Sequence, residues 1–253
     1  MSGLALFLRV LSTEFLKLKR TLALWMVLLS PLVVVELYFL IAFFGADRLG
    51  ARPGDQWMSL VTNTLGLWTM LMMPMFLALE TSLLAGLEHA DKNWKSLLAL
   101  PPPRWMVYVS KWLVVVGMLW GAHLVLAAGT LTTGTILRAF KPVLRIDALP
   151  LTPLVPPLLK ISASALLALT IQHWVSLRWQ SFTAAFGFGM CAMVIGFVAV
   201  NSADFGPWFP WSMSLHALRP RPGTPNVIAV ALTAACVVAS LGAWDFSRRD
   251  VVG

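Results

Sequence analysis

Long apolar runs alternate with short polar segments along the whole chain. Each run is close to the ~20 residues that an α-helix needs to cross a bilayer. Runs such as WLVVVGMLWGAHLVLAAGTLTTG also lack the polar face that a helix of a soluble protein exposes. The pattern predicts an all-α integral membrane protein with a single transmembrane domain over residues 1–253. We expect six spans, at residues 21–44, 60–86, 110–136, 155–177, 182–200 and 225–244.

The segment before the first span predicts a separate helix. Apolar residues recur there three and four positions apart, which is typical of an amphipathic helix, at Leu4, Phe7, Leu11, Phe15 and Leu18. We expect this helix to lie in the membrane interface, with its apolar stripe at the headgroup boundary and its basic residues near anionic lipid. It can be a simple lipid anchor, or Glu14 or Lys17 can bind a partner.

Composition and charge agree with a membrane protein. Hydrophobic residues make up 58% of the chain and charged residues 12%, and the formal net charge is +8. Most basic residues flank the expected spans, where they set orientation, so nucleic-acid binding is not predicted. An even number of spans puts both termini on one side, and the basic flanks indicate that this side is cytoplasmic. The first apolar run is too long for a cleaved signal peptide.

The residues that an intramembrane enzyme would need are not grouped in the sequence. His89, His123, His173 and His216 are widely separated, and no H-E-x-x-H motif occurs. A serine or cysteine nucleophile would need a base and an orienting group, and no local motif supplies them. Cys191 and Cys236 both fall inside expected spans, where we interpret them as small packing residues rather than as a disulfide or a metal site.

The segment LEHADKNWKSLLALPPPRWMVYVSKW, residues 87–112, is longer and more patterned than a simple turn between two spans requires. Asp91 can cap a short helix with Trp94, Leu97 and Leu98 on one face. Proline cannot continue a helix, so the triplet at 101–103 ends it. The segment therefore predicts a stiff docking element on the cytoplasmic side, the alternative being an interfacial turn with its tryptophans among the lipid headgroups.

This segment resembles the loop after the second span in permeases of the ABC-2 type, and most of all in the lantibiotic-immunity permeases. The matching residues are Glu88, His89, Trp94, Lys95, Leu97, Leu98, Leu100, Pro101 and Lys111. The segments IQHWVSLRWQSF at 171–182, FPWSM at 209–213 and DFSRRDV at 245–251 are also similar to the family. The tripled proline and the proline-rich, basic loop at 138–153 depart from it.

The resemblance implies a permease subunit of an ATP-driven exporter in the bacterial inner membrane. Its short cytoplasmic helix, the coupling helix, would dock on a separate ATPase through Glu88, Asp91, Trp94, Lys95, Leu97 and Leu98. The chain has no G-x-x-x-x-G-K-[ST] motif to hold nucleotide phosphates. ATP and magnesium are therefore expected on that ATP-binding subunit, with no catalytic site, metal or cofactor in this chain.

The resemblance leaves the second permease and the substrate open. A second copy or a related permease is expected to complete the pathway. The substrate is expected to be hydrophobic or amphipathic, either an antimicrobial peptide or another hydrophobic compound or drug. Apart from transport, the chain can be an intramembrane enzyme or a scaffold that does not transport.

Ionisable residues inside the expected spans are candidates for the transport pathway, because they are costly in hydrocarbon. Glu80 lies about two turns from the cytoplasmic end of the second span, and Glu36 lies deeper in the first. For both, pairing with another helix and lining the pathway are equally open. We interpret His123 as a neutral histidine hydrogen-bonded between helices, and Lys160 as reaching the outer headgroups.

Overall fold

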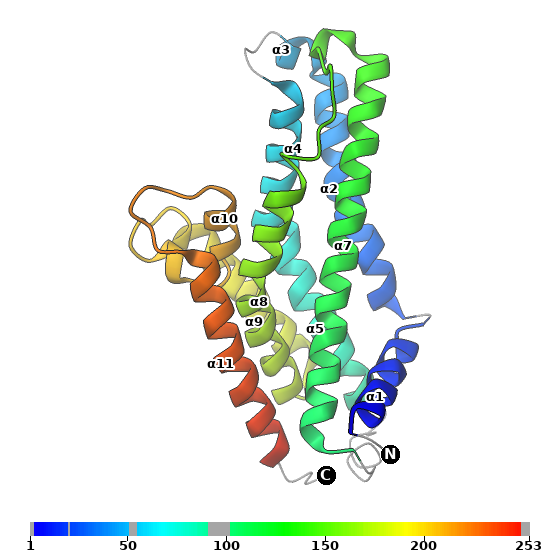
Figure 1. The fold of residues 1–253 in the computed structure, drawn as a ribbon, viewed down its shortest axis with the longest axis vertical. Coiled ribbons are helices and arrows are strands. Elements are labelled where there is room, and N and C mark those ends of the chain that lie inside the picture. Colours follow the sequence, from blue (N-terminus) through cyan, green and yellow to red (C-terminus); the bar gives the residue numbers. More distant parts are fainter. Residues whose placement is uncertain (1–2, 20, 51–54, 91–101, 249–253) are drawn as a thin grey trace.

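The computed structural model describes residues 3–19, 21–50, 55–90 and 102–248, and all regular structure in these ranges is helical (Figure 1). The main helices are α1 (Gly3–Lys17), α2 (Leu22–Phe44), α4 (Gln56–Leu67), α5 (Met73–Ala90), α7 (Arg104–Phe140), α8 (Val155–Arg178), α9 (Phe182–Ala199) and α11 (Val227–Arg248). Shorter elements join them: α3 (Ala46–Gly50), the π-helical turn η1 (Trp68–Met72), the 3₁₀ turns η2 (Pro142–Leu144) and η3 (Gly206–Trp208), and α10 (Met213–Leu218).

Six helices in the described ranges are long and apolar enough to cross a membrane, which confirms the predicted number. They are Leu22–Phe44, Gln56–Leu87, Arg104–Phe140, Val155–Arg178, Phe182–Ala199 and Val227–Arg248. The chain is therefore a multi-pass, all-α membrane protein. The second span combines α4, η1 and α5 into one continuous helical segment.

Helix α7 is longer than the expected third span. Its 37 residues extend over about 55 Å, whereas a bilayer core is about 30 Å thick. Pro103 is its N-cap, so the helix begins directly after the proline triplet. Proline is tolerated at a helix start because the first N–H groups of a helix make no hydrogen bond within it. The extra length continues both ends of α7 beyond the apolar run that the sequence pattern marks.

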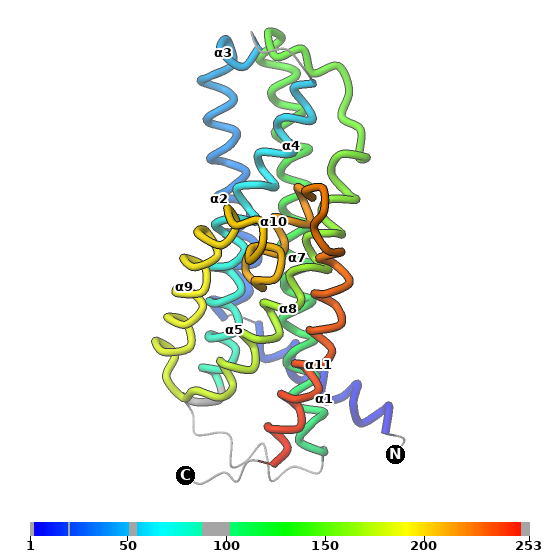
Figure 2. Tube along the Cα trace, turned by 90° about the vertical axis from the view of Figure 1, so that its left-hand side faces the viewer, coloured from blue at the N-terminus to red at the C-terminus, as the bar shows by residue number. Residues whose placement is uncertain are grey.

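The bundle has two distinct ends (Figures 1 and 2). The terminal end holds α1, the last turns of α5 and α11 and the first turns of α7. The far end holds α3 and η2, which the long helices α2, α4 and α7 reach. Because α9 ends and α11 begins near the level of α10, the far end is formed by only part of the bundle.

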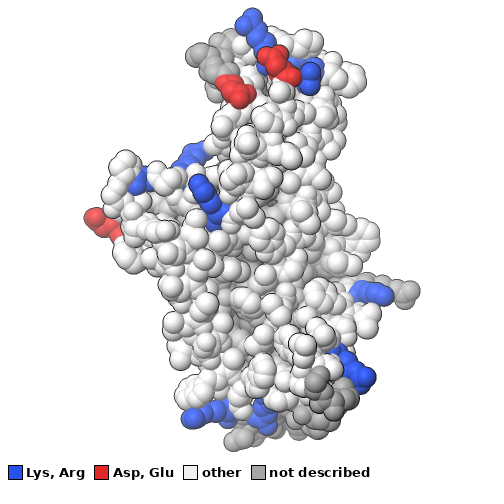
Figure 3. Space-filling model, in the orientation of Figure 1, with Lys and Arg blue, Asp and Glu red and all other residues white. Residues whose placement is uncertain are grey.

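The surface is divided as a membrane protein requires. On the face in Figure 3, charged side chains gather near α3, around α10 and near the terminal end, with uncharged surface between these levels. Large apolar side chains are exposed along the spans, as on α2, where Leu28, Leu32 and Leu40 point outward. Apolar side chains exposed along a span are suited to contact with the acyl chains of lipid.

Small residues let the spans pack closely, as they do in other helical membrane proteins. Helix α5 packs on α9, where a Cβ atom at Gly189 would overlap the Cβ of Ala78. Helix α2 packs on α7, and a Cβ at Gly129 would lie 3.0 Å from a Val35 methyl group. A larger residue at Gly189 would therefore force α5 and α9 apart.

Two sequence interpretations are corrected by the packing. The predicted apolar stripe of α1 is split, because Leu11 and Leu18 pack into the bundle core while Leu4 and Phe15 are exposed. Cys191 and Cys236 do not pack inside the bundle, since both are exposed on their helices. Periodicity shows which residues share a face of a helix but does not show how many neighbours cover that face.

Candidate functional site

The terminal end brings together the elements that flank the predicted docking segment. Helix α5 runs toward this end as far as Ala90, and α7 starts there at Arg104. Helix α1 crosses the same end and packs on α7 (Figure 1). A force applied between α5 and α7 would therefore act on α1 and on the third span together.

A buried ion pair joins α1 to α7. The Lys111 ammonium donates to Glu14 Oε2 at 2.6 Å, and Lys17 donates to the other carboxylate oxygen, Oε1, at 2.8 Å. Glu14 is 2% exposed and Lys111 is fully buried. Buried charges need such partners, because water no longer stabilises them. The sequence interpretation missed this pair, although a lysine and a glutamate inside apolar segments are each a signal for one.

An aromatic cluster fixes the first turns of α7 against α8 and α11. The Tyr108 ring contacts His173 edge-on at 5.0 Å between centroids and lies 5.9 Å from Phe246. Close by, Trp174 Nε1 donates to Asp245 Oδ2 at 2.9 Å, a further tie between α8 and α11. The start of α7 is thus held on three sides, by α1, α8 and α11.

Most of the predicted docking residues lie outside the part of the chain that the structure describes. Asp91, Trp94, Lys95, Leu97 and Leu98 lie outside the described residues, and for Glu88 only its position in α5 is given. The coupling helix therefore stays a prediction. What the structure provides is the position of both its flanks, at the terminal end.

Glu80 is completely buried in α5, at 0% exposure. Neither carboxylate oxygen finds a hydrogen-bond partner among the described residues. Its neighbour Thr81 is fully bonded by contrast: its hydroxyl donates to Leu77 O at 2.8 Å and accepts from Ser176 at 3.1 Å. A buried carboxyl without a partner is energetically costly, so packing alone does not explain the presence of Glu80.

Glu36 lies in a different environment. It is exposed on the outward face of α2, between the exposed side chains of Leu32 and Leu40. It therefore does not line the interior of this bundle. Whether either glutamate contacts a transported molecule remains a prediction.

The remaining intramembrane polar residues lie as follows. His123 Nδ1 and Ser162 Oγ are 2.7 Å apart, a hydrogen bond between α7 and α8 that agrees with the interpretation of His123 as an interhelical residue. Lys160 is exposed near the start of α8. In the described ranges no three His, Cys, Asp or Glu side chains come close enough to hold a metal ion.

Comparison with known proteins agrees with this arrangement. The family model described as "ABC-2 family transporter protein" matches residues 10–219. The match begins inside α1 and ends just after α10, so it includes five of the six spans and the loop between α5 and α7. No curated protein and no solved structure has a significant match to this chain.

Proposed function

The chain belongs to the ABC-2 transporter family and is the permease component of an ABC transporter, and we propose that it exports a hydrophobic or amphipathic substrate using a separate ATPase. The family match over residues 10–219 carries this proposal. We propose that the ATPase is a separate chain, and the lack of a phosphate-binding G-x-x-x-x-G-K-[ST] motif in the 253 residues supports this. The chain is a transmembrane component, and we propose that it has no catalytic site of its own.

The terminal end is the proposed docking side for the ATPase and is proposed to be cytoplasmic. Its basic residues support this orientation, since Arg104 and Arg178 begin and end spans there. We place the protein in a bacterial inner membrane, with a second permease completing the pathway. The resemblance to lantibiotic-immunity permeases makes an antimicrobial peptide the first substrate to test, with other hydrophobic compounds next.

Docking is proposed to centre on the coupling helix. The ATPase would hold residues 88–100, with Trp94, Leu97 and Leu98 inserted and with Glu88 and Lys95 at the rim. Aromatic and aliphatic anchors carry most of an interface's energy, while rim charges contribute less. Movement of the ATPase would then pass into α5 and α7, which directly flank this segment.

The test is copurification of the ATPase with the full chain from detergent, followed by ATP-dependent efflux. Trp94→Ala is expected to weaken ATPase binding by roughly 2 kcal/mol, and Lys95→Ala by less. Arg221→Glu, a charge reversal in the link before α11, serves as control and should leave assembly unchanged. Full association and efflux with Trp94→Ala would show that the segment is only an interfacial turn.

Orientation can be tested independently in whole cells. In a background with Cys191 and Cys236 replaced by serine, Asp204→Cys should react with a membrane-impermeant thiol reagent, because the 201–223 link is proposed to face outward. Lys92→Cys should react only after the cells are opened. If Lys92→Cys is labelled in intact cells and Asp204→Cys is not, the topology is the reverse of the one proposed.

A further inference from the structure

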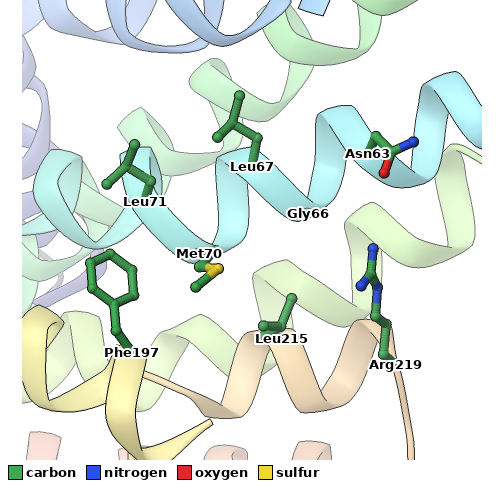
Figure 4. A pocket seen from close by; sticks show the side chains of 8 residues that line it. All are labelled: Asn63, Gly66, Leu67, Met70, Leu71, Phe197, Leu215 and Arg219. Atoms are coloured by element: carbon green, nitrogen blue, oxygen red, sulfur yellow. The ribbon is translucent and has the colours of Figure 1, made fainter. Parts of the chain in front are cut away.

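A groove opens between the second span and the link that joins α9 to α11. It has a volume of about 400 Å³, within the range of sites for small molecules. Three elements contribute its walls: α4 with η1, the end of α9, and α10 (Figure 4). Its lining residues are Asn63, Gly66, Leu67, Met70, Leu71, Phe197, Leu215 and Arg219.

The groove is polar at one end and apolar at the other. Figure 4 shows Asn63 and Arg219 together at one end, and Leu71 and Phe197 at the opposite end. The Arg219 side chain is exposed and has no acidic partner among the described residues. The lining contains no carboxylate that would repel an anion, so an anion can pair with the Arg219 guanidinium. The apolar side chains along the rest of the groove can contact a hydrocarbon chain.

The π-helical turn η1 shapes the apolar end. It directs Trp68 into the core, where the ring is fully buried against Phe76, and leaves Met70 and Leu71 exposed. An extra residue in a helical turn reorients the side chains around it, and such turns are frequent at functional sites. Thr69, in the same turn, keeps a buried hydroxyl with no partner among the described residues, beside a small pocket that shares Met70 and Phe197 with the groove.

The polar end of the groove lies where lipid headgroups are expected. Arg219 directly follows α10, in the link between the end of α9 at Ala199 and the start of α11 at Val227. Since α9 ends and α11 begins there, we expect the boundary of the hydrocarbon core at this level on this side of the bundle. Met70 and Leu71 belong to η1, which follows α4 in the second span, and α5 then continues to the terminal end (Figure 1).

We propose that this groove is a binding site for an anionic phospholipid of the surrounding bilayer. The phosphate pairs with the Arg219 guanidinium, whose planar fork suits phosphate oxygens. One acyl chain lies against Met70, Leu71 and Phe197. The site is distinct from the ATPase docking end and does not depend on the transported substrate.

Charge favours a lipid over a second copy of this chain. A two-fold contact through the groove would place the same surface against itself. It would bring two Arg219 side chains toward each other with no carboxylate in either lining. An anionic lipid neutralises the guanidinium instead, and its chain covers the exposed side chains of Met70 and Leu71.

The experiment is a lipid titration of the full-length chain in detergent, read by native mass spectrometry. The probes are palmitoyl-oleoyl phosphatidylglycerol and the zwitterionic phosphatidylcholine with the same chains. The wild-type chain is expected to bind phosphatidylglycerol at least fivefold more tightly. Arg219→Gln should remove that preference, while Arg221→Gln, which removes a nearby charge outside the groove, should keep it.

Further arms separate the headgroup from the acyl chain. Met70→Trp fills the apolar end and should weaken binding of both lipids. Glycerol phosphate, which carries the headgroup charge without a chain, should not compete. Equal binding of the two lipids by the wild type, or equal losses in Arg219→Gln and Arg221→Gln, would overturn the proposal. So would a change from dimer to monomer in Arg219→Gln with unchanged lipid binding, which would assign the face to a second copy.

Discussion

Glu14→Ala is expected to destabilise the folded protein by about 3–5 kcal/mol, because it removes the carboxylate that neutralises a fully buried lysine. Lys111 lies inside the first turns of α7 and pairs with Glu14 at 2.6 Å. Its ammonium cannot reach bulk water without unpacking α1 from α7. The expected result is a lower midpoint of thermal unfolding in detergent, together with faster amide hydrogen exchange in α1.

Two variants show whether the buried charge is the cause. Lys17→Ala removes the other partner of Glu14. Because the Lys17 side chain is 31% exposed, the loss of stability should be less than about 1 kcal/mol. The double variant Glu14→Leu/Lys111→Met replaces the whole ion pair by apolar groups. It should be more stable than Glu14→Ala and recover most of the stability which that variant loses. If Glu14→Ala unfolds at the wild-type midpoint with unchanged exchange in α1, the pair does not hold the helix in place.

Glu80→Met is expected to have the opposite effect, an increase in the stability of the folded protein. An unpartnered buried polar group costs about 1–3 kcal/mol, so an apolar side chain of similar length should raise the midpoint of unfolding. The adjacent Thr81→Val should lower it, because that hydroxyl is bonded to Leu77 and Ser176. Because Glu80 and Thr81 are neighbours and both are buried, opposite changes in stability cannot come from a general effect of mutating α5.

Transport separates a pathway role for Glu80 from a packing role. If the carboxyl contacts substrate in another conformation of the transporter, Glu80→Gln and Glu80→Met should both reduce efflux and substrate-stimulated ATPase activity at normal amounts of protein. Unchanged efflux would remove Glu80 from the pathway. Loss of stability in Glu80→Met would show that the carboxyl has a partner after all.

The helical fold and the membrane location could be predicted from the sequence, because the hydrocarbon core of a bilayer restricts which structures can cross it. Backbone groups in a bilayer must be bonded within the span, so each run of about 20 apolar residues becomes a helix. The number of spans and the separate N-terminal helix followed from local pattern, whereas the start of α7 at Arg104, six residues before the expected third span, did not. The residues of the docking segment were also read from local sequence, and they remain a prediction.

Only the tertiary structure decided which polar residues meet. Glu14 and Lys111 are 97 positions apart, and the groove joins Asn63 on the second span to Arg219 beyond α10. Glu36 and Glu80 both lie inside expected spans, yet Glu36 is exposed and Glu80 is fully buried. Spans of similar hydropathy can pack in many arrangements, because lipid is as apolar as the helix surfaces themselves. The choice among them depends on close contacts between small residues, which no apolar pattern records.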